Sequence, residues 1–387
     1  MTPAARHAAA IDVLDLWLAG TALERALTNW ARKNRYAGSG DRLAVRNIVF
    51  DVARRRRSTA AAGGAETGRA MVIGLLQQAG IDPTTLFTGQ QYAPAALQPG
   101  EWPIDVGALP DPVRLDFPDW LEGRLVASLG PDFEAVMQAL QFRAPTFLRV
   151  NAKKGDRMSA IRMLAADGIT ARVCDLANNA LEVTDNERKI ATSKAYLYGL
   201  VELQDAASQA VIEQLDLPEK GRILDYCSGG GGKALAMAAK TSAEIFAHDI
   251  DPDRMRNLPQ RTERAGVTIR PLASSELVAS GPFDLVLVDA PCSGSGAWRR
   301  SPGGKWGFQP DDLAALLQTQ TQILEQAAGL VSANGRLGYV TCSILNEENT
   351  DQISGFLAAN HGFQLELQRQ FTSLDGGDGM FVASVKR

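Results

Sequence analysis

The chain has 387 residues, of which 45% are hydrophobic and 22% charged, and a formal net charge of −4. This length allows two or three domains, and the composition is that of an ordinary soluble protein. No apolar stretch approaches the roughly eighteen residues that a membrane span needs, and the N-terminus lacks a signal-peptide pattern. We therefore expect a cytoplasmic protein with no membrane partner.

The four cysteines, Cys174, Cys227, Cys292 and Cys342, are separated from one another by at least fifty residues. The sequence contains no CxxC pair and no Cys/His cluster, which are the patterns typical of zinc sites. We therefore expect no metal site and a reducing compartment.

The first seventy residues are basic although the whole chain is acidic. They hold twelve Lys or Arg against six Asp or Glu, a net charge of +6, and "RRRR" occupies 54–57. A basic block on an acidic chain indicates contact with a polyanion, but a solvated helix face would have the same composition. Apolar spacing predicts helices within 8–58 and over 70–80, while the small residues of 60–68 predict a loose connection.

The middle of the chain changes character twice. The Pro-rich stretch 83–118 predicts an irregular linker, and "FPDWLEGRLVASLG" (117–130) predicts a helix that begins near Asp119. Short strands are expected at 146–152, 171–174 and 181–184 around a helix at 156–167. We interpret 131–215 as a small α/β subdomain.

After residue 220, four short apolar runs alternate with helical stretches. The runs are "GRILDYC", "AEIFAHD", "FDLVLVD" and "RLGYVTC", and the helical stretches are 233–240, 252–265 and 311–331. Strands buried on both faces have this pattern, so it predicts a parallel, doubly wound α/β sheet. Ligands bind such sheets at the carboxyl ends of the strands, where these runs end in acids or cysteines.

The stretch "ILDYCSGGGGKALAMA" (223–238) reads as strand, glycine loop and helix. Cys227 and Ala234 occupy positions where a Walker A loop needs Gly and Ser or Thr, so that interpretation fails. Asp249 lies twenty residues past Gly229, where a carboxylate can accept hydrogen bonds from a ribose diol. This pattern fits either NAD or S-adenosylmethionine.

The cysteines favour S-adenosylmethionine. A dehydrogenase usually needs a general acid such as His, but His7 and His361 are remote from the motifs, and we interpret His248 as structural. If the strands ending in "DAPC" and "VTCS" are neighbours, two thiols meet beside the cofactor. Carbon 5 of a pyrimidine becomes nucleophilic after a thiolate adds to carbon 6, so such a pair suits methylation at carbon 5. Two buried packing cysteines are the alternative.

The motifs "LDYCSGGGGKA", "AHDIDPDRM", "DAPCSGSGAWRRSPGGKW", "YVTCSILNEEN" and "GDGMFVA" together resemble the RNA (cytosine-5) methyltransferases of the Sun family. The resemblance is to the bacterial small-subunit ribosomal RNA enzymes with a NusB-like N-terminal domain. It implies a Rossmann-like S-adenosylmethionine-dependent methyltransferase domain with a mostly parallel, doubly wound sheet at 216–387. In the sequence this domain follows the small α/β subdomain at 131–215. It also implies an all-α NusB-like domain at 1–82, followed by a linker and helix at 83–130.

The resemblance also assigns roles to residues. It implies that Cys342 is the nucleophile, that Cys292 assists product release, and that Asp289 lies against both the cytosine and the cofactor. Asp249 would hold the ribose of the cofactor, and Arg254 would lie on the side of the site that faces the cofactor. The loop residues expected around the cofactor are Cys227, Ser228, Gly229, Gly230, Gly231, Gly232 and Lys233. Lys305 is expected to face the substrate, and "SGSGAWRR" (293–300) to form an RNA-facing loop.

The sequence departs from the family pattern at three points. Gly230 replaces a proline, Ala234 replaces a threonine, and Ser274 or Ser275 would have to substitute for an acid near the adenine. We expect a monomer that binds RNA, most simply 16S ribosomal RNA. A transfer RNA substrate and a non-catalytic RNA-binding or ribosome-assembly factor are the alternatives.

Overall fold

The computed structural model describes residues 1–104 and 107–387, and these residues form two compact units. Unit 1 comprises Met1–Arg143 and Trp298–Phe308, and unit 2 comprises Ala144–Ala297 and Gln309–Arg387. Within the described ranges, none of the helices has the length and apolar character required to cross a membrane. The finer division into 1–82, 83–130, 131–215 and 216–387 stays a prediction.

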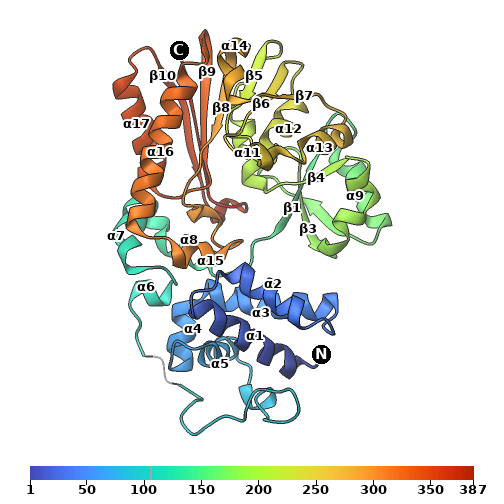
Figure 1. The fold of residues 1–387 in the computed structure, drawn as a ribbon, viewed down its shortest axis with the longest axis vertical. Coiled ribbons are helices and arrows are strands. Elements are labelled where there is room, and N and C mark those ends of the chain that lie inside the picture. The colour runs from blue at the N-terminus through green and yellow to red at the C-terminus, as the bar shows by residue number, and fades with distance from the viewer. Residues whose placement is uncertain (105–106) are drawn as a thin grey trace. The chain divides into compact units, whose positions relative to one another are not determined.

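Unit 1 begins with five helices (Figure 1). They are α1 (Pro3–Leu18), α2 (Leu23–Lys33), α3 (Ser39–Arg54), α4 (Arg56–Gly63) and α5 (Gly68–Gln78), and they enclose a core of Ala, Val, Leu and aromatic side chains. Helices were predicted for 8–58 and 70–80, but α4 occupies part of the predicted loose connection. A Cβ on Gly74 would lie 2.0 Å from the carbonyl oxygen of Thr59, and one on Gly63 would lie 1.8 Å from that of Ala70. The small residues at 60–63 therefore belong to a helix that packs closely against α5, and only 64–67 form the predicted connection.

The remaining elements of unit 1 are short. They are η1 (Pro83–Thr85), α6 (Asp111–Arg114), η2 (Asp119–Leu121), α7 (Glu122–Leu129), η3 (Gly130–Asp132), α8 (Phe133–Leu140) and, from the later segment, α15 (Pro302–Gly307). The predicted linker 83–118 is largely irregular where it is described, and its residues 105–106 lie outside the described residues. The later segment returns to α3: Trp306 Nε1 donates to the carbonyl of Ala53 at 2.6 Å.

Unit 2 begins with a small antiparallel sheet in the order β2–β3–β1–β4. Its strands are β1 (Thr146–Val150), β2 (Thr170–Val173), β3 (Ala180–Asp185) and β4 (Val201–Leu203), and its helical elements are α9 (Arg157–Ala166), η4 (Glu187–Thr192) and α10 (Lys194–Leu197). The three predicted strands and the predicted helix are confirmed. The edge strand β4 was not predicted, because three residues are too few to show an alternating pattern.

A seven-stranded sheet forms the rest of unit 2, in the order β10–β11–β9–β8–β5–β6–β7. Its strands are β5 (Arg222–Asp225), β6 (Glu244–Ala247), β7 (Ile269–Pro271), β8 (Phe283–Asp289), β9 (Val331–Thr341), β10 (Gln364–Phe371) and β11 (Met380–Lys386). Strands β5 to β9 pair in parallel, as predicted, whereas β11 pairs antiparallel with both β9 and β10. This antiparallel edge was not predicted.

Helices cover both faces of the large sheet (Figure 1). One face carries α11 (Ala206–Glu213), α12 (Gly232–Ala238) and α13 (Leu258–Ala265), and the other carries α14 (Leu277–Ser280), α16 (Pro310–Ala328) and α17 (Thr350–Ala359). The short turns η5 (Pro252–Met255), η6 (Ser274–Glu276), η7 (Ser295–Ala297), η8 (Asn346–Glu348) and η9 (Ser373–Asp375) connect them. Because β8 lies between β5 and β9, the carboxyl ends of these three strands meet at one edge of the sheet.

Candidate active site

A cavity of about 1070 Å³ opens within unit 2 at the carboxyl ends of β5, β6, β8 and β9. The residues predicted from the sequence that line it are Cys227, Ser228, Gly229, Gly230, Gly232, Lys233, Asp249, Arg254, Asp289, Cys292 and Cys342. Gly231 is the one predicted loop residue outside this lining.

Gly231 shapes the loop from beneath. Its φ of +79° is left-handed, and a Cβ there would lie 2.3 Å from Cδ1 of Leu258 on α13. Gly229 also has positive φ, +51°. Glycine adopts such angles without the steric cost that other residues incur. The glycines therefore allow the chain to turn tightly from β5 into α12 while the loop faces the cavity.

Asp249, just past the end of β6, fastens this loop to the neighbouring strand. Its buried carboxylate accepts hydrogen bonds from the backbone N–H groups of Gly229 at 2.8 Å and Asp251 at 3.0 Å. Arg254 forms an ion pair with it at 3.1 Å, while more than half of the arginine side chain remains exposed. The sequence spacing therefore brings Asp249 and the glycine loop together at the cavity wall.

An ion pair joins α12 to the end of β8. Lys233 Nζ donates to Asp289 Oδ2 at 2.7 Å. Burial lowers the pKa of Lys233, but the attraction and hydrogen bond of Asp289 outweigh burial, and the net pKa is raised. The lysine is therefore held as a buried cation beside the cavity.

Asp225 lies at the end of β5 beneath this pair, and sequence reasoning missed it. Its Oδ2 accepts from the Ser228 hydroxyl and the Ala234 N–H, both at 3.0 Å, while Oδ1 has no hydrogen-bond partner among the described residues. Burial, followed by repulsion from Asp289, raises its pKa to about 7. The available signal was an acid inside the apolar run "GRILDYC".

Two thiols meet at the ends of β8 and β9. The sulfurs of Cys292 and Cys342 lie 3.3 Å apart, within hydrogen-bond distance. This hydrogen bond lowers the pKa of Cys342, with further help from the charge of Lys233 and against burial. The same hydrogen bond raises the pKa of Cys292 well above its ordinary value. The pair can therefore hold one negative charge, which resides mainly on Cys342.

Cys227 is a third thiol in the cavity wall. Burial raises its pKa to about 12, with further increases from nearby carboxylates. It therefore stays protonated at neutral pH, and a protonated thiol is a poor nucleophile.

His248 and Ser274 form another part of the wall. The imidazole uses both nitrogens: Nδ1 lies 2.7 Å from the carbonyl of Tyr226, and Nε2 lies 2.9 Å from the Ser274 hydroxyl. Both side chains line the cavity, whereas Ser275 does not. Of the two serines that the sequence offered as substitutes for an acid, only Ser274 faces this space.

Comparison with known proteins relates this geometry to a family. A family model described as 16S rRNA methyltransferase RsmB/F matches residues 212–384, and one described as an RsmF/B-like ferredoxin-like domain matches 117–188. Ribosomal RNA small subunit methyltransferase B from two Xylella fastidiosa strains is 33% identical over 285 residues, 69% of this chain and 66% or 68% of those relatives. The chain belongs to the RsmB/F methyltransferase family.

Two further comparisons describe the extent of this likeness. A probable ribosomal RNA small subunit methyltransferase B from Bacillus subtilis is 32% identical over 276 residues, 67% of this chain and 61% of that protein. The chain thus spans about two thirds, or slightly less, of the relatives that it matches. The crystal structure of PH0851 superposes with a TM-score of 0.77 at 22% identity and covers 100% of this chain and 99% of that chain. The predicted family and α/β fold class are confirmed.

Two predictions of substrate-facing features are wrong. Lys305 is buried in unit 1, where its Nζ donates to the carbonyl of Arg54 at 3.1 Å. Burial lowers the pKa of this lysine to about 8, against the attraction of Asp116. The stretch 293–300, predicted to be an RNA-facing loop, buries Ser295 and Trp298. Glycines and serines near a site look like an open loop in sequence, but here they pack against neighbouring backbone.

The basic block 1–70 was predicted to contact a polyanion, but most of its "RRRR" run is engaged within unit 1. Arg54 is only 4% exposed and donates to the carbonyl of Arg299. Arg56 pairs with Glu66 at 2.6 Å, and Arg57 pairs with Asp119. Most of this run therefore joins parts of unit 1 to one another.

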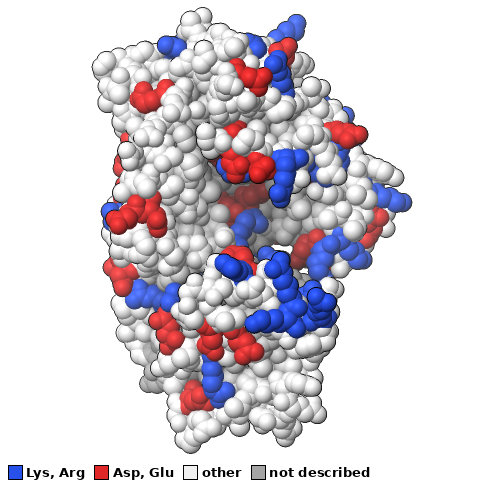
Figure 2. All heavy atoms as spheres, viewed as in Figure 1, with Lys and Arg blue, Asp and Glu red and all other residues white. Residues whose placement is uncertain are grey.

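A different set of cations is exposed on unit 1. Figure 2 shows Lys and Arg side chains gathered over α2 and α3. We call this set the α2–α3 basic surface: Arg25, Arg32, Lys33, Arg35, Arg42 and Arg46. Within the described part of the chain, none of the six forms an ion pair with Asp or Glu, so their charges remain available to a polyanion.

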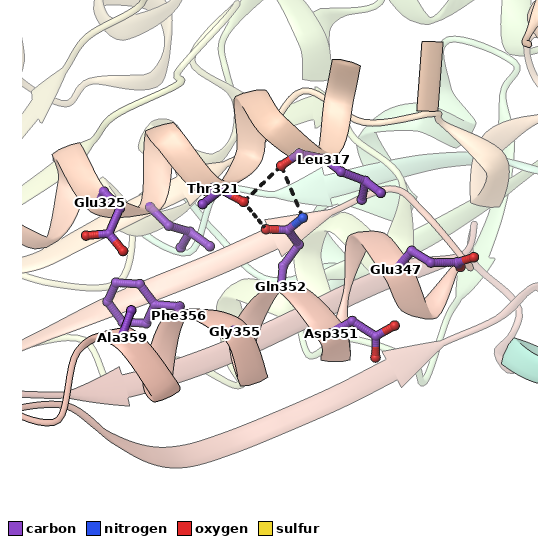
Figure 3. Close-up of a pocket in the computed structure, with 10 residues that line it drawn as sticks. Leu317, Thr321, Glu325, Glu347, Asp351, Gln352, Gly355, Phe356 and Ala359 are labelled. Atoms are coloured by element: carbon purple, nitrogen blue, oxygen red, sulfur yellow. Dashed lines mark hydrogen bonds between the residues drawn. The ribbon is translucent and has the colours of Figure 1, made fainter. Parts of the chain in front are cut away.

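A second hollow, of about 400 Å³, lies between α16 and α17 (Figure 3). Thr321 and Gln352 bridge its floor: the threonine hydroxyl donates to Gln352 Oε1 at 3.0 Å, and the amide donates to the carbonyl of Leu317 at 3.2 Å. None of the described residues that line it is Cys, His or Lys. It therefore offers no thiol, imidazole or amine, in contrast to the larger cavity.

Proposed function

We propose that the chain methylates carbon 5 of a cytosine in 16S ribosomal RNA, with S-adenosylmethionine as the methyl donor. The observation that carries this proposal is the pair of thiols 3.3 Å apart at neighbouring strand ends, beside the Lys233–Asp289 ion pair. Family membership and the relatives' names support the substrate class.

The cavity residues suit the methyl donor. S-adenosylmethionine, when bound, supplies a methyl group made electrophilic by its sulfonium sulfur. Asp249 and Arg254 lie where a ribose and a carboxylate could be held, and the glycine loop from Cys227 to Lys233 would surround the methionine end. A cavity of about 1070 Å³ has room for both this molecule and an unstacked base.

Cys342 is the residue that we assign as the nucleophile. Its lowered pKa favours the thiolate, which is the reactive form of cysteine. The thiolate forms a bond to carbon 6 of the cytosine, and the displaced electron pair makes carbon 5 able to accept the methyl group. Asp289 would hold the N3 edge of the ring and stabilise the adduct.

Cys292 is assigned to product release. After methylation, a base takes the proton from carbon 5, the electron pair of that C–H bond re-forms the double bond between carbons 5 and 6, and the Cys342 sulfur leaves carbon 6 as a thiolate. Cys292 lies 3.3 Å from that sulfur, so it can assist this elimination from the protein side. Its raised pKa keeps it protonated while Cys342 is a thiolate.

We assign RNA docking to the α2–α3 basic surface, which lies within the basic block 1–70. Its six exposed cations can neutralise phosphates, a sequence-independent interaction that weakens with salt. A cytosine flipped out of its stack would then enter the catalytic cavity. A monomer acting in the cytoplasm stays a prediction.

The test uses purified protein, tritiated S-adenosylmethionine and 16S RNA from a strain that lacks the gene. Wild type should form 5-methylcytosine, Cys292→Ala should accumulate a covalent RNA adduct, and Cys342→Ala should be inactive without one. Cys174→Ala, which lies outside the cavity lining, is the matched control and should behave as wild type. Loss of activity in both cavity variants without any adduct would contradict the role assignment.

A further inference from the structure

A fully buried carboxylate lies against the two loops that carry the thiols. Glu348, in the turn η8 that follows β9, has 0% of its surface exposed. No Lys or Arg of the described ranges lies within ion-pair distance of it. A buried carboxylate without a cation is costly unless hydrogen bonds satisfy its oxygens.

Four donors satisfy Glu348: three come from the two cysteine loops and the fourth comes from α16. Its Oε1 accepts from the Ser293 N–H at 2.8 Å and from Gln320 Nε2 at 3.0 Å. Its Oε2 accepts from the hydroxyls of Ser293 and Ser343, both at 2.5 Å. Ser293 directly follows Cys292, and Ser343 directly follows Cys342. One carboxylate therefore binds the residue after each thiol.

Further hydrogen bonds stiffen the same junction. The hydroxyls of Ser295 and Ser343 lie 3.0 Å apart, and Ser295 also accepts from the Ile344 N–H at 2.9 Å. Gln320 Nε2, on α16, donates to the carbonyl of Pro291 at 2.9 Å as well as to Glu348. The two loops have no freedom to separate without leaving buried polar groups unpaired.

We propose that Glu348 is a positioning residue that ties the two cysteine loops to one carboxylate and so fixes the distance between the thiols. Its importance for methylation rests on the function proposed above, because only that reaction uses both thiols. A misplacement of about 1 Å in a reacting group can reduce a rate by roughly 100-fold. A clamp shared by both loops prevents such a displacement.

The charge of Glu348 has a separate, measurable effect. It raises the pKa of both Cys292 and Cys342. The other charged groups that act on Cys342 are Asp289, which raises its pKa, and Lys233, which lowers it. Loss of the Glu348 charge alone should therefore lower the pKa of Cys342 and move its ionisation to lower pH.

The test compares Glu348→Gln with Glu347→Gln in the full chain. Glu347 is the neighbouring residue but lines the hollow between α16 and α17 (Figure 3), so it is a matched control. Iodoacetamide alkylation of Cys342 is followed against pH by peptide mass spectrometry, without RNA or cofactor. We expect the midpoint of alkylation to move to lower pH in Glu348→Gln and to stay in place in Glu347→Gln.

Two kinetic measurements test the positioning itself. Diamide takes two electrons and two protons from a thiol pair to form a disulfide, and its rate reports how readily Cys292 and Cys342 meet. At a pH above the alkylation midpoint of both proteins, where the thiolate fractions are equal, we expect Glu348→Gln to slow this oxidation about 10-fold or more. We also expect it to lower kcat for methylation by roughly 10- to 100-fold with little change in KM. A kcat loss without a KM change indicates lost positioning, not lost binding.

Ser343→Ala and Ser293→Ala provide a second route if Glu348→Gln folds poorly. Each removes one hydroxyl donor and should slow the oxidation while leaving the pH midpoint of alkylation close to wild type, because the carboxylate charge remains. Equal behaviour of the Glu348 and Glu347 variants in alkylation and oxidation would overturn the proposal. Because these readouts need no RNA, they stand apart from any failure of wild type to methylate.

Discussion

The substitution Asp225→Asn should make the stability of unit 2 less dependent on pH. In the wild type, burial raises the pKa of Asp225 from its ordinary 3.8 to about 7. The folded state therefore holds a proton that the unfolded state releases at lower pH. The stability associated with Asp225 is fully present below pH 4 and is lost as the pH rises through about 7.

The size of this effect follows from the pKa difference. A shift of about 3 units corresponds to about 4 kcal/mol of unfolding free energy, because each unit is worth about 1.4 kcal/mol. Between pH 5 and pH 8, the unfolding free energy of the wild type should fall by about 2 to 3 kcal/mol because of Asp225. Asparagine can accept from Ser228 and Ala234 through its carbonyl, but its amide cannot ionise. Its own cost, an unpaired N–H where Oδ1 now lies, is the same at every pH.

The distribution of tryptophans and cysteines allows the unfolding of each unit to be followed separately. All six tryptophans lie in unit 1, and all four cysteines lie in unit 2. Urea unfolding at pH 5, 6, 7 and 8 can therefore be followed by tryptophan fluorescence for unit 1 and by a brief thiol-labelling pulse for unit 2. The difference between Asp225→Asn and wild type should grow in favour of the variant as the pH rises, in the thiol signal alone.

A constant offset between the two proteins from pH 5 to pH 8 would refute this reasoning. It would mean that Asp225 is already ionised in the folded state, through water or a stronger interaction with Lys233. An equal pH-dependent change in tryptophan fluorescence would also contradict it, because Asp225 belongs to unit 2.

Three other changes test the glycine loop, the basic surface and the buried lysine. Gly231→Ala should destabilise unit 2 by about 1 to 2 kcal/mol because Gly231 has a left-handed φ. It should also weaken S-adenosylmethionine binding, measured by calorimetry. Gly304→Ala is the control and should do neither, because the space around Gly304 is open. Combined Arg32→Glu and Lys33→Glu should weaken RNA binding. They should also reduce the slope of log affinity against log salt concentration by roughly 0.7 to 0.9 per lost phosphate contact. Arg56→Gln is the control and should leave that slope unchanged, because Arg56 is paired with Glu66. Burial lowers the pKa of Lys305 to about 8 in the folded state, so the unfolding free energy of unit 1 should increase as the pH rises from 8 towards 10.5. Lys305→Met should abolish that increase, as followed by tryptophan fluorescence during unfolding.

The larger cavity was predictable because its residues follow buried strands. Apolar runs that end in Asp249, Asp289, Cys292 and Cys342 predict a parallel sheet, and parallel strands present their carboxyl ends at the same edge. The adjacency of β8 and β9 then brings the thiols within 3.3 Å of each other. Local pattern and general topology were sufficient here.

Features that depend on distant partners were not predictable. The run 54–57 has the composition of an RNA contact, but Glu66 and Asp119 neutralise two of its arginines from separate parts of the chain. Lys305 follows Cys292 closely in sequence, yet it is buried in unit 1 against Arg54. A count of charges contains no information on pairing, so it could not distinguish these residues from the α2–α3 basic surface.

The family resemblance assigns roles to the two thiols, but the order in which they ionise depends on the same three-dimensional information. Their sequence contexts, "PCS" and "TCS", are too alike to say which cysteine ionises first. In the structure, one hydrogen bond lowers the pKa of Cys342 and raises that of Cys292, so the pair titrates as a unit. If Cys342 bonds to the cytosine as proposed, its negative charge disappears. The main influence that raised the pKa of Cys292 is then removed, so Cys292 becomes more acidic only after the adduct has formed, when its assistance in release is needed.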